Sequence, residues 1–193
     1  MNRAEPIKNP KQLQLFKDFY RVMEPDSRNY LLITVALNTA LRISDILTLR
    51  WGDIYDFSKA SCPGHLVVTE KKTGKETQIF INDSIRQALS DYRDSLKKGE
   101  LCADTFLFPG SRTPCLNRVQ AWRIIREAAE KCGISGVISP HSLRKTFGYH
   151  AWKQGTPPAM LMDIYQHSSY EITKRYLGIS QDERDEVFRN IAI

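Results

Sequence analysis

Apolar side chains recur at helical spacing along most of this chain. Leu13, Phe16 and Tyr20 follow Asn9-Pro10, a capping residue and a proline suited to a first helical turn, so a helix should run to about Met23. Apolar residues at the same spacing, with capping residues before them and helix-breaking residues after them, predict further helices. These helices should cover residues 27–40, 44–49, 83–98 and 117–133, a stretch from residue 139 onward, and residues 172–176 and 180–191.

One part of the chain alternates between apolar and polar residues as a β-hairpin does. HLVVTEKK and KETQIFI, within residues 65–81, are rich in β-branched and aromatic residues and flank Thr73-Gly74. Residues 51–57 should add a third strand, and FLFPG at 106–110 a short strand and turn. The pattern therefore predicts an α+β fold, mainly helical, with a small antiparallel three-stranded sheet.

The helix that begins at Ser139-Pro140 has the outline of a phosphate site. His141 lies in its first turn, where free backbone N–H groups and the helix dipole favour an anion. Arg144, three residues later, shares that face, while Leu143 and Phe147 form an apolar stripe. For either polar residue alone, a helix cap or a surface charge is the simpler interpretation.

Other residues with matching chemistry are scattered along the chain. Arg42 lies in the bend before a short helix, where its planar fork can face a phosphate, and Asp45 could hold it there. A lone ion pair of this kind contributes little. Tyr176 follows His167; its ordinary pKa is about 10, but a tyrosine among cations can attack a phosphodiester.

The charge distribution favours a polyanionic partner. The 193 residues suit one domain and carry a net charge of +6, with a pI near 9.2. Residues 101–150 hold seven Lys or Arg against three acids, so the positive charge is concentrated there. Candidate DNA-contacting side chains are Lys71, Lys75, Arg118, Arg123, Lys145 and Lys174, although lysines at a hairpin tip or arginines along a helix are often only solvated.

Several other chemistries lack support. The four cysteines form no Cys-x-x-Cys pair, so neither a zinc site nor a disulfide framework is expected. There is no Gly-Lys-Ser/Thr loop for ATP and no carboxylate cluster for paired magnesium ions. No apolar run indicates a membrane span. A cytoplasmic protein that transfers phosphoryl groups without metal or cofactor is the expectation.

Taken together, these stretches resemble the tyrosine recombinase/integrase family. ALRISDILTLRW, EKKTGK, HSLRKTFG, and QHSS with Tyr176 nine residues after His167 reproduce the order Arg, Lys, His-x-x-Arg, His, Tyr. Each element alone is weak, but the ordered set covers nearly the whole catalytic-domain pattern. The resemblance implies site-specific DNA recombination through a 3′-phosphotyrosyl intermediate. The partners would be duplex DNA and further copies of the protein, which would assemble as a dimer or tetramer on the DNA and could be monomers when free. Accessory DNA-bending proteins could also take part.

The resemblance also implies a role for each residue. Arg42 and Arg144 would grip the scissile phosphate, Tyr176 would attack phosphorus, and Lys72 would protonate the leaving oxygen. His141 would exchange the proton of Tyr176, and His167 would hydrogen-bond the phosphate. Asp45 would support the arginines. No metal or cofactor is implied.

This chain departs from the family pattern in three places. Tyr165-Gln166 precedes His167, where the family often has Leu-Gly. Lys71 and Lys72 are adjacent, so either could be the acid; Lys72 is preferred. The pattern starts almost at Met1, which predicts one catalytic domain over residues 1–193 without an N-terminal DNA clamp. Residues 1–8 would be a tail, and residues 180–193 a C-terminal helix packed in cis or in trans.

Two interpretations of the length and two rival functions stay open. The chain is similar to single-domain members such as the fimbrial phase-variation recombinases, or it is an excised fragment. The same residues could carry out a type IB topoisomerase-like nicking and closing reaction. A catalytically silent DNA-binding regulator is the other alternative, which the complete set of six residues argues against.

Overall fold

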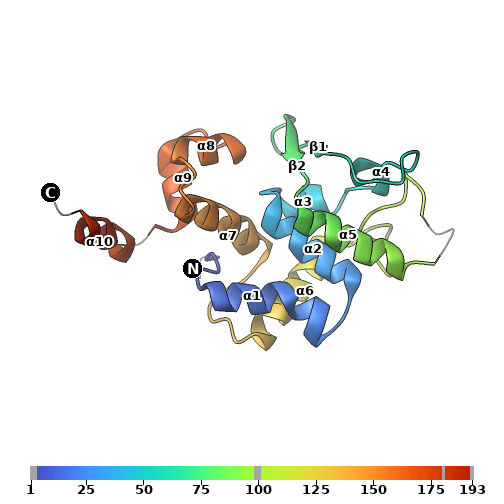
Figure 1. Ribbon diagram of the computed structural model, residues 1–193, viewed down its shortest axis with the longest axis horizontal. Helices are drawn as coiled ribbons and strands as arrows, with labels where there is room; N and C mark the ends of the chain where they lie inside the picture. The colour runs from blue at the N-terminus through green and yellow to red at the C-terminus, as the bar shows by residue number, and fades with distance from the viewer. Residues whose placement is uncertain (1–3, 98–100, 180, 192–193) are drawn as a thin grey trace.

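The computed structural model describes residues 4–97, 101–179 and 181–191, which fold into a mainly helical structure with one small sheet (Figure 1). The helices are α1 (Pro10–Asp18), the π-helix η1 (Phe19–Met23), α2 (Ser27–Asn38), α3 (Ile43–Ile46), α4 (Trp51–Ile54), α5 (Asp83–Ser95), α6 (Arg118–Lys131), α7 (Pro140–Lys153), α8 (Pro158–Ile164), α9 (Tyr170–Leu177) and α10 (Gln181–Asn190). The strands are β1 (His65–Thr69) and β2 (Glu76–Phe80). The predicted α+β class is confirmed.

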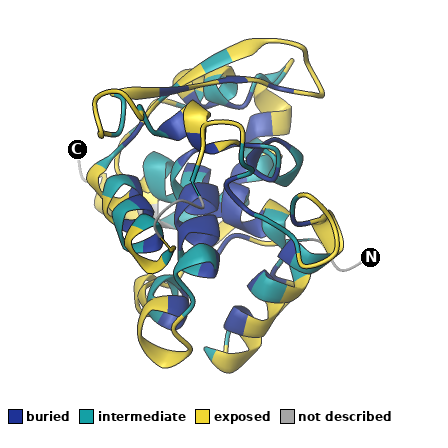
Figure 2. Ribbon diagram, turned by 90° about the vertical axis from the view of Figure 1, so that its right-hand side faces the viewer, coloured by how far each residue is buried: buried dark blue, intermediate teal, exposed yellow. Residues whose placement is uncertain are grey.

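The main core surrounds α2. This helix is apolar on nearly all sides, and Leu31, Leu32 and Val35 are fully buried. It packs against α5 and α7, and Figure 2 shows the buried residues gathered along the middle of the molecule. An element that is apolar all round is stable only in the interior, so the sequence pattern of residues 27–40 already required this position.

The sheet has two strands among the described residues, and the prediction of a third was wrong. β1 and β2 pair antiparallel, with His65 opposite Phe80 and Thr69 opposite Glu76. Residues 51–54 form the helical turn α4 because Asp53 caps the backbone N–H of Arg50 at 2.7 Å. The predicted strand at FLFPG is reduced to one isolated bridge between Arg50 and Phe106.

Local capping signals placed most helix starts correctly. Asn9, Asn82, Asn117 and Ser139 are the N-caps of α1, α5, α6 and α7. The exception is Ser44, which lies inside α3; Arg42 is the N-cap there, and the helix ends at Ile46 rather than Leu49. α5 ends at Ser95, three residues before the expected end.

The N-terminal stretch, expected as a tail, is packed over its described part. Ile7 is 2% exposed, and its N–H donates to Thr146 Oγ1 at 2.9 Å. Lys145 Nζ donates to the carbonyl of Ala4 at 2.9 Å. Residues 4–8 therefore hold the middle of α7 by long-range contacts that the sequence pattern did not indicate.

A second, smaller core joins α8 and α9 to α7. It consists of Leu161, Tyr165, Leu177 and Ala40, with Phe147 and Tyr176 at its margin. Gly148 in the middle of α7 makes room for this core, because a Cβ there would lie 2.2 Å from the Tyr165 hydroxyl and 2.9 Å from Leu177 Cδ2.

α10 stands apart from the rest of the ribbon (Figure 1). Lys8 Nζ, 3.4 Å from Glu183 Oε2, links it to the N-terminal stretch. The predicted capping residue Ser180 lies outside the described residues. Among the helices that the structure describes, none has the length and apolar character needed to cross a lipid bilayer.

Candidate active site

The structure brings the predicted catalytic residues to one place from five separate segments. Arg42 comes from the start of α3, Lys72 from the β1–β2 turn, and His141 and Arg144 from the first turns of α7. His167 lies in the α8–α9 loop and Tyr176 near the end of α9. Tyr176 is the centre: its hydroxyl lies 3.4 Å from His141 Nδ1, and its ring lies 5.0 Å from that of His167.

The start of α7 presents a buried cation. Ser139 and Ser142 cap each other, and Pro140 occupies the first turn, which fixes where the helix begins. Arg144 is only 5% exposed. Its guanidinium lies 5.1 Å from the Tyr165 ring centre and donates to the Tyr165 carbonyl at 3.4 Å.

Arg144 retains hydrogen-bonding capacity. Within the described part of the chain, its buried Nε has no hydrogen-bond partner. Since buried donors are nearly always paired, this N–H is suited to an anion that enters the site. Burial lowers the pKa of Arg144 and the nearby Arg42 adds to the effect, while Tyr176 and Glu70 oppose it.

Arg42 is held by a carboxylate that the sequence interpretation did not choose. It forms an ion pair with Glu70, which is 2% exposed. Asp45, the expected partner, accepts the backbone N–H of Lys71 at 3.2 Å. Asp45 thus ties the β1–β2 turn to α3. Strand alternation was the signal for Glu70, because it continues the inward series Leu66, Val68.

Lys72, the preferred one of the two adjacent lysines, lies near enough to His167 for its charge to act there. Its positive charge is among the causes that lower the pKa of His167. The turn that carries it is closed by Glu70, whose N–H donates to the Lys75 carbonyl at 2.9 Å and whose carbonyl accepts from Gly74 N–H at 2.8 Å. The Lys72 side chain is exposed.

The phenol of Tyr176 is neutral near pH 7. Burial raises its pKa to about 12, although Arg144 and Arg42 oppose that rise. Burial lowers the pKa of His141, and the positive charges of Lys145, Arg144 and Arg42 lower it further. His141 is therefore neutral near pH 7 and can accept the phenol proton at Nδ1.

His167 is also held neutral and oriented. Burial, then Arg144 and Arg42, lower its pKa to about 4. Its Nδ1 lies 3.0 Å from the hydroxyl of Thr173, which is fully buried. If that hydroxyl donates to Nδ1, the ring proton is on Nε2, where it can be donated to a phosphate oxygen.

The candidate DNA-contacting residues fall into two groups. Lys145 lies over the Tyr176 ring at 5.5 Å, Lys71 and Lys75 are exposed near the β1–β2 turn, and Lys174 is half-buried on α9. Arg118 and Arg123 are exposed on α6. Lys145 is therefore adjacent to the ring of Tyr176.

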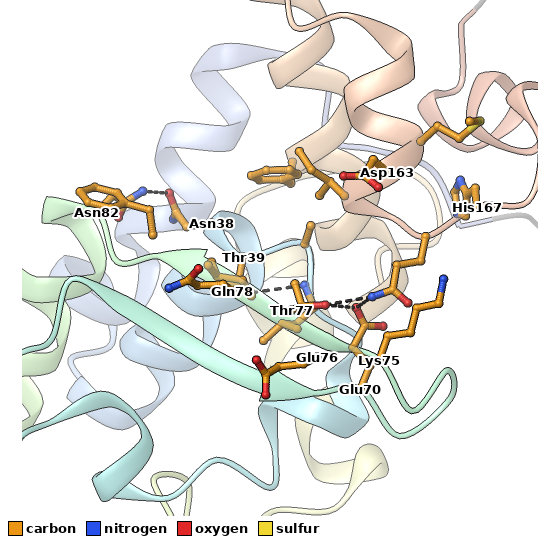
Figure 3. Close-up of a pocket in the computed structure, with 18 of the residues that line it drawn as sticks. Asn38, Thr39, Glu70, Lys75, Glu76, Thr77, Gln78, Asn82, Asp163 and His167 are labelled. Carbon is orange, nitrogen blue, oxygen red and sulfur yellow. Dashed lines mark hydrogen bonds between the residues drawn. The ribbon is translucent and has the colours of Figure 1, made fainter.

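A cavity of about 860 Å³ lies beside His167, between the end of α2, β2 and α8. Figure 3 shows Glu70, Thr77, Lys75 and His167 toward one end, and the hydrogen-bonded pair Asn38 and Asn82 at the other. No cluster of three or more His, Cys, Asp or Glu side chains suited to a metal ion occurs among the residues that the structure describes.

Comparison with known proteins agrees with this arrangement. The model of the phage integrase family matches residues 9–183. The probable integrase/recombinase YoeC of Bacillus subtilis (strain 168) is 39% identical over 183 residues, which cover 94% of this chain and 93% of that protein. Tyrosine recombinase XerD of Corynebacterium glutamicum is 30% identical over 168 residues, which cover 85% of this chain and 52% of that protein.

Solved structures share the fold at lower sequence identity. The XerA recombinase superposes with a TM-score of 0.76 at 20% identity over 99% of this chain and 68% of that chain. The structure of XerH bound to palindromic difH substrate has a TM-score of 0.76 at 16% identity, over 98% of this chain and 53% of that chain. The chain thus spans about half the length of XerD and XerH, and nearly the full length of YoeC.

Proposed function

Because this chain belongs to the phage integrase family and is a tyrosine-type site-specific DNA recombinase, we propose that Tyr176 is its nucleophile. The observation that carries the proposal is the pairing of the half-buried Tyr176 phenol with His141 Nδ1 at 3.4 Å, beside the buried Arg144 of the same chain. A tyrosine needs a base and nearby cations to attack a phosphodiester, and both are present.

In the proposed reaction, the Tyr176 oxygen attacks phosphorus as His141 takes the phenol proton. The bond from phosphorus to the 5′ oxygen breaks, and Lys72 gives that oxygen a proton. The DNA 3′ end remains on Tyr176, and a 5′ hydroxyl is released. Arg42, Arg144 and His167 neutralise the charge on the non-bridging oxygens. Because the covalent link keeps the energy of the phosphodiester, rejoining requires neither a nucleotide nor a metal.

The partners we propose are duplex DNA and further copies of this chain, in the cytoplasm. Val187 and Phe188 on α10 are 54% and 77% exposed, and Ile191 directly after it is 59% exposed, although helices usually bury such side chains. Their exposure supports packing in trans, against a neighbouring copy on DNA, as a dimer or tetramer. DNA-bending accessory proteins would be a further component of that assembly.

Covalent trapping tests the nucleophile. Purified protein is mixed with a pool of nicked duplexes that carry a randomised segment, and adducts that resist denaturation are recovered and sequenced. Wild type should enrich a defined site, whereas Tyr176→Phe should give no adduct. Adducts without a shared sequence would favour a topoisomerase-like activity, and no wild-type adduct would favour a silent DNA-binding regulator.

Arg144→Lys tests the role of the guanidinium on the enriched duplex. An ammonium keeps the charge but not the planar fork, so the rate of adduct formation should fall by about 100-fold or more, while DNA affinity changes little. Rates come from single-turnover trapping and affinities from anisotropy. Equal losses in both would assign Arg144 a purely electrostatic role.

A further inference from the structure

Gln166 stands in a backbone conformation that favours glycine. Its φ is +53°, where a side chain costs energy that glycine avoids. The family pattern often has Gly at this position, directly before the histidine that becomes His167 here. A residue other than glycine persists in such a conformation when its surroundings hold it. The contacts of the Gln166 side chain should therefore explain why glutamine is found here.

Those contacts reach the β-hairpin. Gln166 Nε2 donates to Glu70 Oε1 at 3.0 Å and lies 2.9 Å from Thr77 Oγ1. Thr77 Oγ1 donates in turn to Glu70 Oε1 at 3.2 Å. Figure 3 shows Thr77 and Glu70 joined at the end of the cavity near Lys75. The α8–α9 loop is thereby tied to a carboxylate 96 residues away in the chain.

Glu70 connects three parts of the active site. One carboxylate oxygen binds Arg42 and the other receives Gln166 and Thr77. Its backbone closes the turn that carries Lys72. The Glu70 charge also lies near enough to Arg144 to oppose the lowering of that residue's pKa. A buried carboxylate at this point offsets the repulsion between two catalytic cations.

We propose that Gln166 and Glu70 form a positioning link, which fixes the His167 loop and the Lys72 turn relative to Arg42 before the scissile phosphate enters. The inference rests on the proposed function, since it concerns the geometry of that reaction. Neither residue touches the phosphate; both act through the groups they hold. Small displacements of reacting groups reduce rates steeply, so such a link affects the chemical step more than DNA binding.

Two rival interpretations make opposite predictions. If Gln166 were only tolerated at its position, Gln166→Gly would relieve the backbone and leave the rate of adduct formation unchanged. If Glu70 instead withheld Arg42 from the phosphate, Glu70→Gln would accelerate that rate. A positioning link predicts slower adduct formation in both variants.

The test compares Gln166→Gly, Glu70→Gln, the double variant and the control Ala60→Gly. Ala60 is exposed, has a φ of +50° and lies outside the active site, so it reproduces the backbone relief alone. The probe is the duplex recovered by covalent trapping of wild type. Single-turnover adduct rates, DNA affinity and thermal unfolding midpoints are measured for each variant.

Gln166→Gly should lower the rate about tenfold without lowering the unfolding midpoint. Glu70→Gln should lower the rate at least as much but bind the duplex as tightly as wild type or more tightly, because the region becomes more positive. The double variant should be no slower than the slower single variant, since one link is lost in each. Ala60→Gly should cleave as wild type does.

Three results would each overturn the link. Gln166→Gly could form the adduct at the wild-type rate, Glu70→Gln could form it faster than wild type, or the rate losses of the two single variants could multiply in the double variant. A wild-type protein that forms no adduct would instead overturn the proposed function. In that case, the positioning role would fall with it, while the unfolding midpoints of the variants would still show whether Gln166 and Glu70 are coupled in the free protein.

Discussion

The two cores of this molecule position different groups of the proposed active site. The main core, centred on α2, positions Arg42 and the β-hairpin. α7 borders this core through the fully buried Leu143. The small core of Leu161, Tyr165 and Leu177 positions His167 and Tyr176. The arginines proposed to bind phosphate are thus held by the larger core, and the proposed nucleophile is held by the smaller one.

This difference separates stability from reactivity. A large close-packed core cannot collapse around a deleted side chain, whereas a small one at the edge of the molecule can relax. Damage to the main core should therefore appear mostly as lost stability. Damage to the small core should appear mostly as a misplaced nucleophile, since Tyr176 packs at its margin.

A matched pair of leucines gives the largest expected effect. Leu31 and Leu161 are both fully buried, one in each core. Leu31→Ala should lower the free energy of unfolding by about 3–5 kcal/mol, and Leu161→Ala by about 2–3 kcal/mol. The adduct rate, measured where both variants are folded, should fall more for Leu161→Ala. Urea unfolding gives the free energies, and covalent trapping gives the adduct rates. A larger rate loss for Leu31→Ala than for Leu161→Ala would contradict the division between the cores.

Gly148→Ala sharpens the comparison at the seam between α7 and the small core. The new methyl group would meet the Tyr165 hydroxyl and Leu177, and overpacking of this kind costs about 1–3 kcal/mol. The hydroxyl also donates to the Arg144 carbonyl at 2.7 Å, so its displacement should disturb Arg144 as well. The adduct rate should fall about tenfold or more.

The double variant Gly148→Ala with Tyr165→Leu is the control for that prediction. Leucine lacks the ring and hydroxyl that the methyl group would strike, so it should recover much of the unfolding free energy. If Gly148→Ala alone left both stability and adduct rate unchanged, the close approach of α7 to Tyr165 would have no energetic importance.

The smallest effect concerns pH. The pKa of His167 is lowered to about 4 in the folded protein, chiefly by burial, and the unfolded value is about 6.5. Below pH 6.5 the unfolded chain binds a proton that the folded chain does not, so the free energy of unfolding should decrease from pH 6.5 toward about 4. His167→Gln should show a shallower decrease in urea titrations; an identical slope would contradict the pKa shift.

Much of the fold follows from signals local in sequence. Asn9-Pro10, Asn117 with Gln120, and Ser139-Pro140 each fix a helix start through bonds within three residues, and each was predicted correctly. Helical periodicity placed α2 in the interior. Residues 51–57 were misassigned because their β-forming composition is overridden by the Asp53 cap and by Trp51, which is 1% exposed and whose N–H donates to the Thr105 carbonyl at 2.9 Å.

The candidate site divides in the same way. The sequence by itself determined which side chains we propose for the chemistry, because their types and order are read directly from the chain. Only the tertiary structure decided which carboxylate holds Arg42, that Gln166 reaches Glu70, and that Gly148 admits Tyr165. The residues in these three pairs lie 28, 96 and 17 positions apart in the sequence, respectively. Helix caps and the spacing of apolar residues depend on neighbours within a few residues in the sequence. The partner of a buried charge depends instead on how the whole chain packs.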